Sequence, residues 1–330
     1  MKRFSLRAAV AAAALVLALP AAAAPALAPE SYTAETSYAK LVGAYPFIRI
    51  ASGQAPATVE LLRDLEYVRH GERGLQLDLY LPAKRTAAAR PAIVLVHGGG
   101  WRSGVRANLA PMAIRMAQRG YAAATVSYRL SPEAPYPAAI HDVKAALRWV
   151  RSHAAQYGID PGRIAVGGGS AGGQIASLAG VSDGLARFDP GASAGGVSSR
   201  VQAIVNIDGL SDFTSEMARK YEDDPARQPS AAGAWLGGRY ADTPERWRDA
   251  SPTFYVGRQT PPILFIGSSK PRFAVGHDEM LVKLRAAGVP GEVVVLADTP
   301  HSFWLFDPWL DPTVEATVRF LDRYMGPSGP

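Results

Sequence analysis

The sequence predicts an α/β fold, in which a mostly parallel central sheet has helices on both faces and a small helical insertion. Along the 330 residues, short apolar segments alternate with segments of helical period, which is typical of a parallel sheet covered on both faces. The segment 92–96 (AIVLV) is apolar throughout and lies between Pro91 and a run of glycines, as expected of a strand buried on both faces.

The N-terminal segment is organised like a secretory signal peptide. Three basic residues precede an apolar run over 8–19, and Pro20 and further small residues follow that run. We therefore expect a signal peptide over 1–23, cleaved after Ala23, and a periplasmic or extracellular protein. No later apolar run has the roughly 18 residues that a membrane span needs, so we expect no stable membrane insertion.

Charge and composition exclude several classes of protein. The formal charge is +6, from 35 basic and 29 acidic residues, and three of the basic residues lie in the predicted signal peptide. The remaining charge of about +3 is scattered, which predicts a solvated surface and no nucleic-acid partner. Cysteine is absent, so disulfides, thiolate metal sites and a cysteine nucleophile are excluded.

After the signal peptide we expect an N-terminal arm or linker over 24–60 and then one main domain over 61–330. The domain begins with two paired strands, 65–69 and 75–81, on either side of a tight turn. Later strands are predicted at short apolar runs, at 121–128, 164–166, 201–207, 262–267 and 292–296. Helices are predicted from apolar residues at helical spacing, at 107–119, 138–157, from 171 onward, in a segment ending near 288, and at 313–325. The insertion is expected over 211–259, as a lid-like helical segment.

The segment 168–172 (GGSAG) has the pattern G-x-S-x-G and lies between a predicted strand and a predicted helix. Glycines on both sides allow neighbouring backbone to pass close to a serine on a strained strand-to-helix turn. The N-terminus of the following helix favours negative charge near the serine oxygen. We therefore predict that Ser170 is a nucleophile.

A second glycine-rich segment, 97–101 (HGGGW), directly follows the buried strand 92–96. Glycines at the carboxyl edge of a parallel sheet can turn backbone N–H groups toward a substrate carbonyl oxygen. The expected donors of such an oxyanion hole are the N–H groups of Gly99, Gly100 and Ala171. We expect His97 to hold the loop in place and Trp101 to contact the substrate.

His301 follows the last predicted strand, in the segment 298–304 (DTPHSFW). A serine, then an acid, then a histidine after the last strand is one of the chain orders in which serine hydrolases carry their catalytic residues. We predict that His301 is the general base that takes the proton of Ser170.

These motifs together resemble a known family. The similarity covers about 65–325 and rests on five segments: 97–101 (HGGGW), 128–132 (YRLSP), 136–137 (YP), 160–161 (DP) and 167–173 (GGGSAGG). They resemble the α/β-hydrolase carboxylesterases, a group that includes hormone-sensitive-lipase-like and bacterial feruloyl-esterase-like enzymes. The resemblance implies an α/β-hydrolase fold for the catalytic domain and a serine esterase that acts through an acyl-enzyme, with no metal or organic cofactor.

A narrower resemblance concerns the substrate. The segments 207–209 (IDG), 271–273 (PRF) and 301–306 (HSFWLF), with 308–309 (PW), are similar to esterases that deacylate plant polysaccharides. This implies an acetylated or feruloylated cell-wall polysaccharide, such as pectin or xylan, as the partner of a secreted enzyme.

The acid of the predicted triad departs from the family pattern. Related enzymes usually carry Asp a few residues past the penultimate strand, where this chain has 267–271 (GSSKP) without a carboxylate. Asp208 ends the strand after the nucleophile helix, and Asp278 is the first acid downstream of 267–271. The role needs a buried carboxylate against the imidazole N–H. We favour Asp208, with Asp278 as the alternative and Asp212 as a third candidate.

Further residues are candidates for substrate binding. We expect an exposed platform for sugar rings formed by Phe303, Trp304 and Trp309, and a uronate-binding cation in Arg272. The plainer alternatives are packing of the last helix and a structural salt bridge. For the function, the alternatives are an amidase or formamidase-like enzyme, a short-chain lipid esterase of the same fold, and a non-catalytic binding protein.

Overall fold

The computed structural model describes residues 31–84, 86–131, 133–192, 196–227 and 229–326. The predicted signal peptide lies outside these residues. An eight-stranded sheet has the order β2-β3-β5-β4-β6-β7-β8-β9, in which β3 runs antiparallel to both neighbours and every other pair is parallel. Its strands are β2 Val59–His70, β3 Arg73–Pro82, β4 Arg90–Val96, β5 Ala122–Val126, β6 Ile159–Gly169, β7 Ala203–Ile207, β8 Ile263–Ser268 and β9 Gly291–Leu296.

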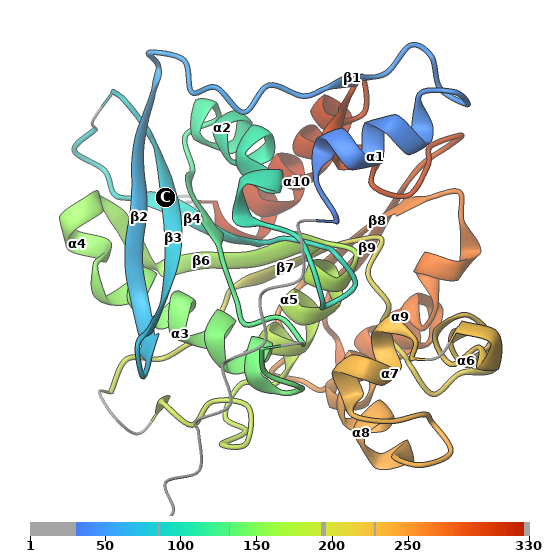
Figure 1. The fold of residues 1–330 in the computed structure, drawn as a ribbon. Helices are drawn as coiled ribbons and strands as arrows, with labels where there is room; N and C mark the ends of the chain where they lie inside the picture. The colour runs from blue at the N-terminus through green and yellow to red at the C-terminus, as the bar shows by residue number, and fades with distance from the viewer. Residues whose placement is uncertain (1–30, 85, 132, 193–195, 228, 327–330) are drawn as a thin grey trace, which may run out of the picture.

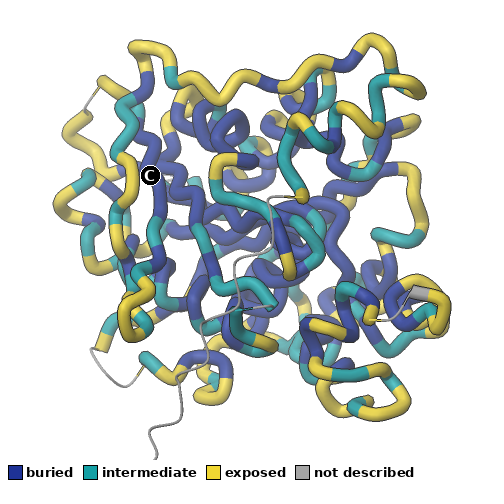
Figure 2. The backbone as a smooth tube through the Cα atoms, in the orientation of Figure 1, coloured by how far each residue is buried: buried dark blue, intermediate teal, exposed yellow. Residues whose placement is uncertain are grey.

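The burial of each strand follows from its place in the sheet. β5, β7 and β8 are buried along their whole length, because helices cover both faces of these strands and their sequences are almost entirely apolar. β9, the last strand in the order, alternates exposed and half-buried residues. Figure 2 shows the buried strands crossing the middle of the molecule.

Helices cover the two faces of the sheet and form two apolar cores with it (Figure 1). On one face are α2 Ala110–Gln118 and α10 Leu310–Met325; on the other are α3 Ala138–Ser152, α5 Ala171–Val181 and α9 His277–Ala287. The buried residues of α10 recur on one side of the helix: Leu310, Thr313, Val314, Ala316, Thr317, Phe320, Leu321 and Met325. The predicted α/β fold is therefore confirmed.

Most predicted elements lie close to where the sequence places them, but the bounds of several differ. The helix predicted over 138–157 is divided at His153 into α3 and the short α4 Ala154–Tyr157. The helix ending near 288 begins at His277, after a separate 3-10 turn, η5 Pro271–Ala274. Gly276, with φ of 82°, lies directly before this helix, in a backbone region that glycine adopts easily.

The N-terminal segment is more ordered than the expected arm or linker. From residue 33 it contains the capped helix α1 Ala34–Leu41, and β1 Arg49–Ile50 pairs with β10 Phe306–Asp307. Ile48 is buried in the same core as α2 and α10. The apolar side chains of this segment explain the difference, because they cover the end of a core that would otherwise face solvent.

The chain between β7 and β8 forms the predicted helical insertion. It contains α6 Glu216–Glu222, α7 Ala231–Leu236 and α8 Pro244–Asp249, with short 3-10 turns between and after them. Trp235 and Trp247 are fully buried within it. The insertion lies beside α9 and the carboxyl ends of the central strands (Figure 1), and it therefore borders the site described next.

Candidate active site

Ser170 lies on the sharp turn between β6 and α5, at the N-cap of the helix. Its φ of 58° and ψ of −125° are a strained backbone conformation for a residue with a side chain. The turn is held by a hydrogen bond from the Ser170 N–H to the Ile207 carbonyl oxygen, at 2.8 Å. A Cβ added at Gly98 would lie 2.8 Å from the Gly169 carbonyl oxygen and 3.1 Å from the Ser170 Cβ. Only glycine therefore allows the 97–101 loop to pass this close to the serine.

His301 connects Ser170 to a buried carboxylate. Its Nε2 is 2.9 Å from the Ser170 Oγ, and its Nδ1 is 2.9 Å from Asp208 Oδ2. With the proton on Nδ1, the ring donates to Asp208 and accepts from the serine hydroxyl. Asp208 is 1% exposed, and its Oδ1 accepts a hydrogen bond from the Ser268 N–H at 2.7 Å.

The structure thus distinguishes between the three candidate acids. Asp278 is exposed in the first turn of α9. Asp212 accepts hydrogen bonds from the N–H and the hydroxyl of Thr214, both at 2.7 Å. Among these three carboxylates, Asp208 is the one that contacts His301.

Two aromatic rings fix the plane of the His301 imidazole. Phe273, in η5, stacks on it with ring centroids 3.5 Å apart and planes 9° apart, while Trp304 meets it edge-on at 5.2 Å. No local pattern in the sequence indicates the contact between Phe273 and His301, because the two residues lie 28 positions apart and meet only when β8 and β9 are paired.

A cavity of 100 Å³ opens beside the serine, and its wall includes Ser170, Ala171 and Gly100. Among the described residues, the N–H groups of Gly99, Gly100 and Ala171 donate no backbone hydrogen bond in the loops and turns. Gly100 and Ala171 are thus placed where they can donate to an oxygen in this cavity. Gly99, with φ of 122°, is held through its carbonyl oxygen, which accepts hydrogen bonds from the Ser103 N–H and hydroxyl.

His97 has the structural surroundings expected of it. It is buried, its Nδ1 lies 2.8 Å from the Gly98 carbonyl oxygen, and its ring stacks on Tyr128 with centroids 4.4 Å apart. Loss of solvation lowers the pKa of His97 to about 4, so the ring is neutral at neutral pH.

The three residues expected to bind substrate have different positions. The exposed aromatic platform is wrong for Phe303 and Trp304, which are 0% and 1% exposed. Trp304 packs under the serine turn, where it occupies the space that a Cβ at Gly169 would need. Trp101 lines the small cavity, but it is 4% exposed and its indole N–H donates to Gln174 Oε1 at 2.9 Å.

Arg272 takes part in the structural salt bridge considered as its plainer role. Its Nη2 lies 2.7 Å from Glu222 Oε1, and the Glu222 side chain is 8% exposed. Both residues also line the small cavity beside Ser170. The sequence could not indicate this pair, because 50 positions separate its members.

An open cleft of 640 Å³ lies on the other side of His301. Leu41 and Tyr45 of the N-terminal segment line it, together with Met217 and Tyr221 of α6. The N-terminal segment is fastened near the site by the Tyr32 hydroxyl, which lies 3.2 Å from the Ser302 Oγ. Burial raises the pKa of Tyr32 to about 12.

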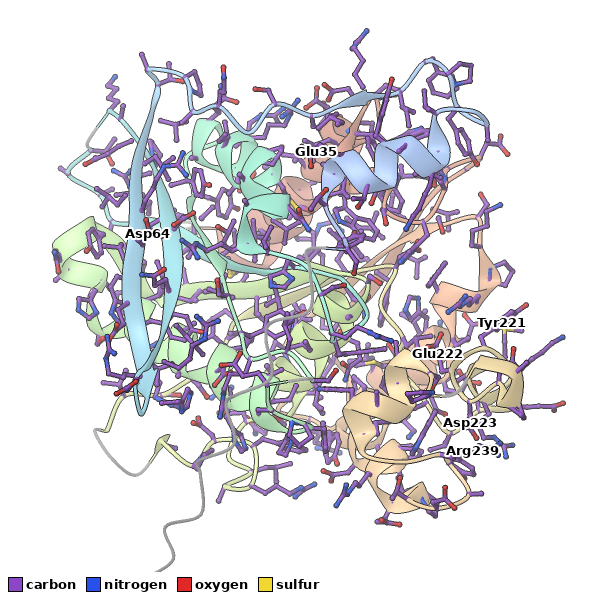
Figure 3. The ribbon with its side chains drawn as sticks, viewed as in Figure 1. Glu35, Asp64, Tyr221, Glu222, Asp223 and Arg239 are labelled. Atoms are coloured by element: carbon purple, nitrogen blue, oxygen red, sulfur yellow. The ribbon has the colours of Figure 1, made fainter. Side chains whose placement is uncertain are left out.

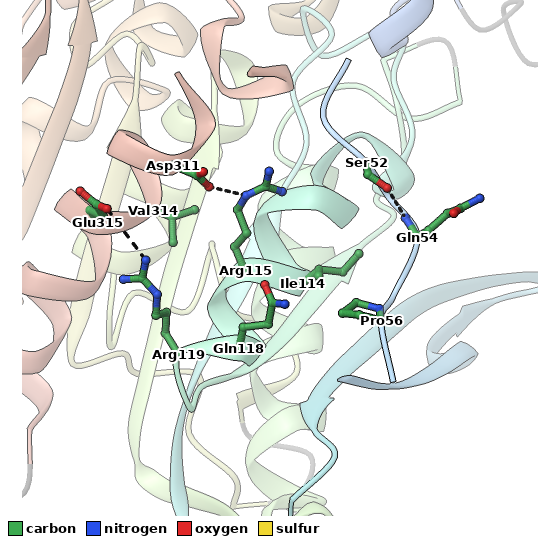
Figure 4. Close-up of a pocket in the computed structure, with 10 residues that line it drawn as sticks. All are labelled: Ser52, Gln54, Pro56, Ile114, Arg115, Gln118, Arg119, Asp311, Val314 and Glu315. Atoms are coloured by element: carbon green, nitrogen blue, oxygen red, sulfur yellow. Dashed lines mark hydrogen bonds and ion pairs between the residues drawn. The ribbon is translucent and has the colours of Figure 1, made fainter. Parts of the chain in front are cut away.

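Another cavity, of 390 Å³, lies between α2, α10 and residues 52–56, away from the serine (Figure 4). Its cations are paired: Arg115 with Asp311, and Arg119 with Glu315. Within the residues that the structure describes, no cluster of three or more His, Asp or Glu side chains is arranged to hold a metal ion. The same part of the chain contains no helix long and apolar enough to cross a bilayer.

Comparisons with known proteins identify a family and several related esterases. The family model BD-FAE matches residues 77–276. The probable carboxylic ester hydrolase LipM and the esterase LipQ, both from Mycobacterium tuberculosis (strain ATCC 25618 / H37Rv), are 31% and 30% identical over 74% and 78% of this chain. The matches cover 56% and 58% of those two proteins, so the chain spans a little over half of their length.

Solved structures show the same fold. A truncated carbohydrate esterase from gut microbiota matches 82% of this chain and 99% of its own, with a TM-score of 0.63 and 22% identity. A bifunctional GH43-CE protein of Bacteroides eggerthii matches 83% of this chain and 39% of its own, with a TM-score of 0.68 and 26% identity. The central sheet, the serine turn and the strand-end histidine together have the arrangement of an α/β hydrolase.

Proposed function

The chain belongs to the BD-FAE family, the bacterial feruloyl-esterase-like group of α/β hydrolases, and from this premise we propose that it is a serine esterase. One observation carries the proposal: Ser170, His301 and Asp208 form a continuous hydrogen-bonded series with both links at 2.9 Å. This is the geometry that activates a serine hydroxyl for attack on an acyl carbon.

The reaction would proceed in two halves. Ser170 Oγ attacks the ester carbonyl carbon while His301 Nε2 takes its proton, and Asp208 stabilises the resulting imidazolium. The N–H groups of Gly100 and Ala171 donate to the oxyanion. The bond to the alcohol oxygen then breaks, and His301 returns the proton to the leaving alcohol. Water attacks the acyl-enzyme by the same route, releasing the acid and restoring the serine.

For the substrate, we propose acylated plant cell-wall polysaccharides, with acetyl or feruloyl as the acyl group. The resemblance of residues 207–209, 271–273 and 301–306 to polysaccharide esterases supports this proposal. The open cleft of 640 Å³ beside His301 supports it as well, because it can accommodate a bulky alcohol. The phenol rings of Tyr45 and Tyr221 offer this cleft apolar faces with polar tips.

We further propose that the protein is exported, because its first 23 residues have the order of a signal peptide. A secreted enzyme has access to polysaccharides that a cytoplasmic one does not meet. Mass spectrometry of the protein from its native cell should find an N-terminus close to Ala24. Full-length chain with Met1, recovered from the cytoplasm, would contradict export without affecting the esterase proposal.

The function is tested with the Ser170→Ala variant and a panel of esters. Wild type should hydrolyse p-nitrophenyl acetate and release acid from xylans or pectins, whereas the variant should lose at least about a thousandfold in kcat, as triad removals do. Circular dichroism of the variant should match wild type. A folded variant that keeps more than about a tenth of the wild-type rate would refute the role of Ser170.

A further inference from the structure

Two cavities meet at the candidate active site, and the same two residues separate them. Arg272 and Phe273 line both the 100 Å³ cavity beside Ser170 and the 640 Å³ cleft beside His301. The serine opens into the small cavity, and the histidine opens into the large one. The Ser170 Oγ and the His301 Nε2 lie 2.9 Å apart, so the two cavities meet at the pair of reacting residues.

The roles of Ser170 and His301 in ester hydrolysis assign one part of the substrate to each of the two cavities. The acyl carbon becomes bonded to Ser170, and its oxygen must lie near the N–H groups of Gly100 and Ala171, which line the small cavity. The alcohol takes its proton from His301, which lines the large cleft. The acyl chain thus extends into the small cavity, while the alcohol lies in the cleft.

Part of the wall of the small cavity is an ion pair between the insertion and the core. Glu222 ends α6, and Arg272 lies in η5, directly after β8. Their side chains meet at 2.7 Å, with Glu222 8% and Arg272 34% exposed. The guanidinium also lies 5.1 Å from the ring centroids of Tyr221 and Phe273. These contacts hold the pair in one position across the end of the cavity.

The volume of the cavity limits what it can hold. An apolar cavity of about 150 Å³ is known to accept one benzene molecule, and one water occupies about 30 Å³ in the liquid. A cavity of 100 Å³ has room for an acyl chain of a few carbons and lacks the room for the ring and propenoyl chain of a feruloyl group.

We propose that the cavity beside Ser170 is the acyl pocket and that the Glu222–Arg272 ion pair is its end wall, which selects short aliphatic acyl groups and so narrows the proposed acyl group from acetyl or feruloyl to acetyl. This inference rests on the proposed esterase function. Glu222 and Arg272 are specificity-determining residues: they limit the length of the acyl chain and take no part in proton transfer.

The test compares acyl-chain profiles of wild type and Arg272→Ala. Shortening the arginine removes one of the two side chains that line both cavities, so the acyl pocket becomes larger on the side of the cleft. Wild type should prefer p-nitrophenyl acetate over the octanoate by at least about tenfold in kcat/KM, a size discrimination that pockets commonly reach. In Arg272→Ala, the octanoate-to-acetate ratio of kcat/KM should rise by about tenfold or more. Phe273 is left unchanged because it stacks on His301.

Glu222→Ala shortens the other member of the ion pair and should raise the octanoate-to-acetate ratio of kcat/KM as well. Arg272→Lys keeps a long cationic side chain and should leave this ratio near that of wild type. The matched control is Arg239→Ala, which breaks a neighbouring pair of the insertion, Arg239 with Asp223 at 3.3 Å. Figure 3 shows Asp223 and Arg239 beside Glu222, but neither lines the two cavities at the site. The control should keep the wild-type ratio.

Equal turnover of acetate and octanoate by wild type would overturn the inference and leave the esterase proposal standing. An octanoate-to-acetate ratio of kcat/KM that stays at the wild-type value in both Arg272→Ala and Glu222→Ala would also overturn the inference and leave the esterase proposal standing. If one of these variants fails to fold, the other decides. No hydrolysis of any ester by the folded wild-type protein would instead refute the esterase function itself.

Discussion

Backbone strain at single residues is concentrated at the candidate active site. Among the described residues, six residues other than glycine have a positive φ: Asp64, Trp101, Ser170, Asp208, Asp298 and Ser302. Ser170 and Asp208 belong to the hydrogen-bonded series, Trp101 lines the cavity beside the serine, and Ser302 directly follows His301. Such conformations cost about 1–3 kcal/mol each and persist where the surroundings impose them. The surrounding fold thus holds the reactive groups in place at the expense of stability.

The sequence predicted the serine and the histidine from their local patterns, but it left the acid open between three residues. The choice depends on which strand end carries its carboxylate to the ring of His301, and pairing of the strands decides this. The choice between exposure and burial of Trp304 was left open for a similar reason. An aromatic residue after a catalytic histidine has the same local pattern whether it faces solvent or packs under the serine turn.

Substitution of Asp208 tests the role of the acid. Asp208→Asn keeps the shape of the side chain but presents the wrong partner to the Nδ1–H of His301, so kcat should fall by about three to four orders of magnitude. Asp278→Asn makes the same chemical change at an exposed position of α9 and should cost tenfold or less, by the roughly neutral behaviour of surface sites. Steady-state kinetics on p-nitrophenyl acetate measure both variants. The reverse outcome would assign the role to Asp278.

At the scale of elements, the insertion supports the loop that carries the oxyanion donors. Trp235 of α7 stacks on Trp101 with ring centroids 5.0 Å apart and planes 10° apart, and it meets Tyr136 edge-on at 5.1 Å. A Cβ at Gly100 would lie 3.3 Å from Ala231, at the start of α7. The sequence predicted a helical segment here, but its contact with the 97–101 loop arises from tertiary packing that no local pattern encodes.

Truncation of Trp235 should reveal this support. Trp235→Ala removes a fully buried side chain and should lower the free energy of unfolding by about 3–5 kcal/mol. Trp235→Phe should cost clearly less, because it keeps an aromatic ring and removes an indole N–H that has no partner among the described residues. Equilibrium unfolding in urea measures both. Equal losses of unfolding free energy in Trp235→Ala and Trp235→Phe would contradict a packing role for the aromatic ring of Trp235.

The N-terminal segment is the element that the sequence predicted least well. Its short helix and two-residue strand have little local pattern, and their stability comes from the core they cover and from the Tyr32 contact with Ser302. Leu41 and Tyr45 reach the cleft beside His301, although the segment lies outside residues 77–276, where the family model matches. Part of the wall of this cleft is therefore formed by residues outside the range that the family model matches.

Across the whole molecule, the order of the sheet explains why the site forms where it does. The serine follows β6, Asp208 follows β7, and His301 follows β9. These strands run parallel through β8, so their carboxyl ends meet at one edge of the sheet. The alternation of strands and helices could be predicted from the sequence, because most of the buried strands are short and almost entirely apolar. The strand order could not, since it depends on pairing between distant segments.

Covalent labelling with a fluorophosphonate probe tests whether Ser170 is an activated nucleophile in the folded protein. Intact mass spectrometry should show one adduct per chain, and peptide mapping should place it on Ser170, because the hydroxyl beside His301 is the activated one. Ser170→Ala should remain unlabelled under the same conditions. An absence of labelling in folded wild-type protein, or an adduct on a different residue, would contradict the account.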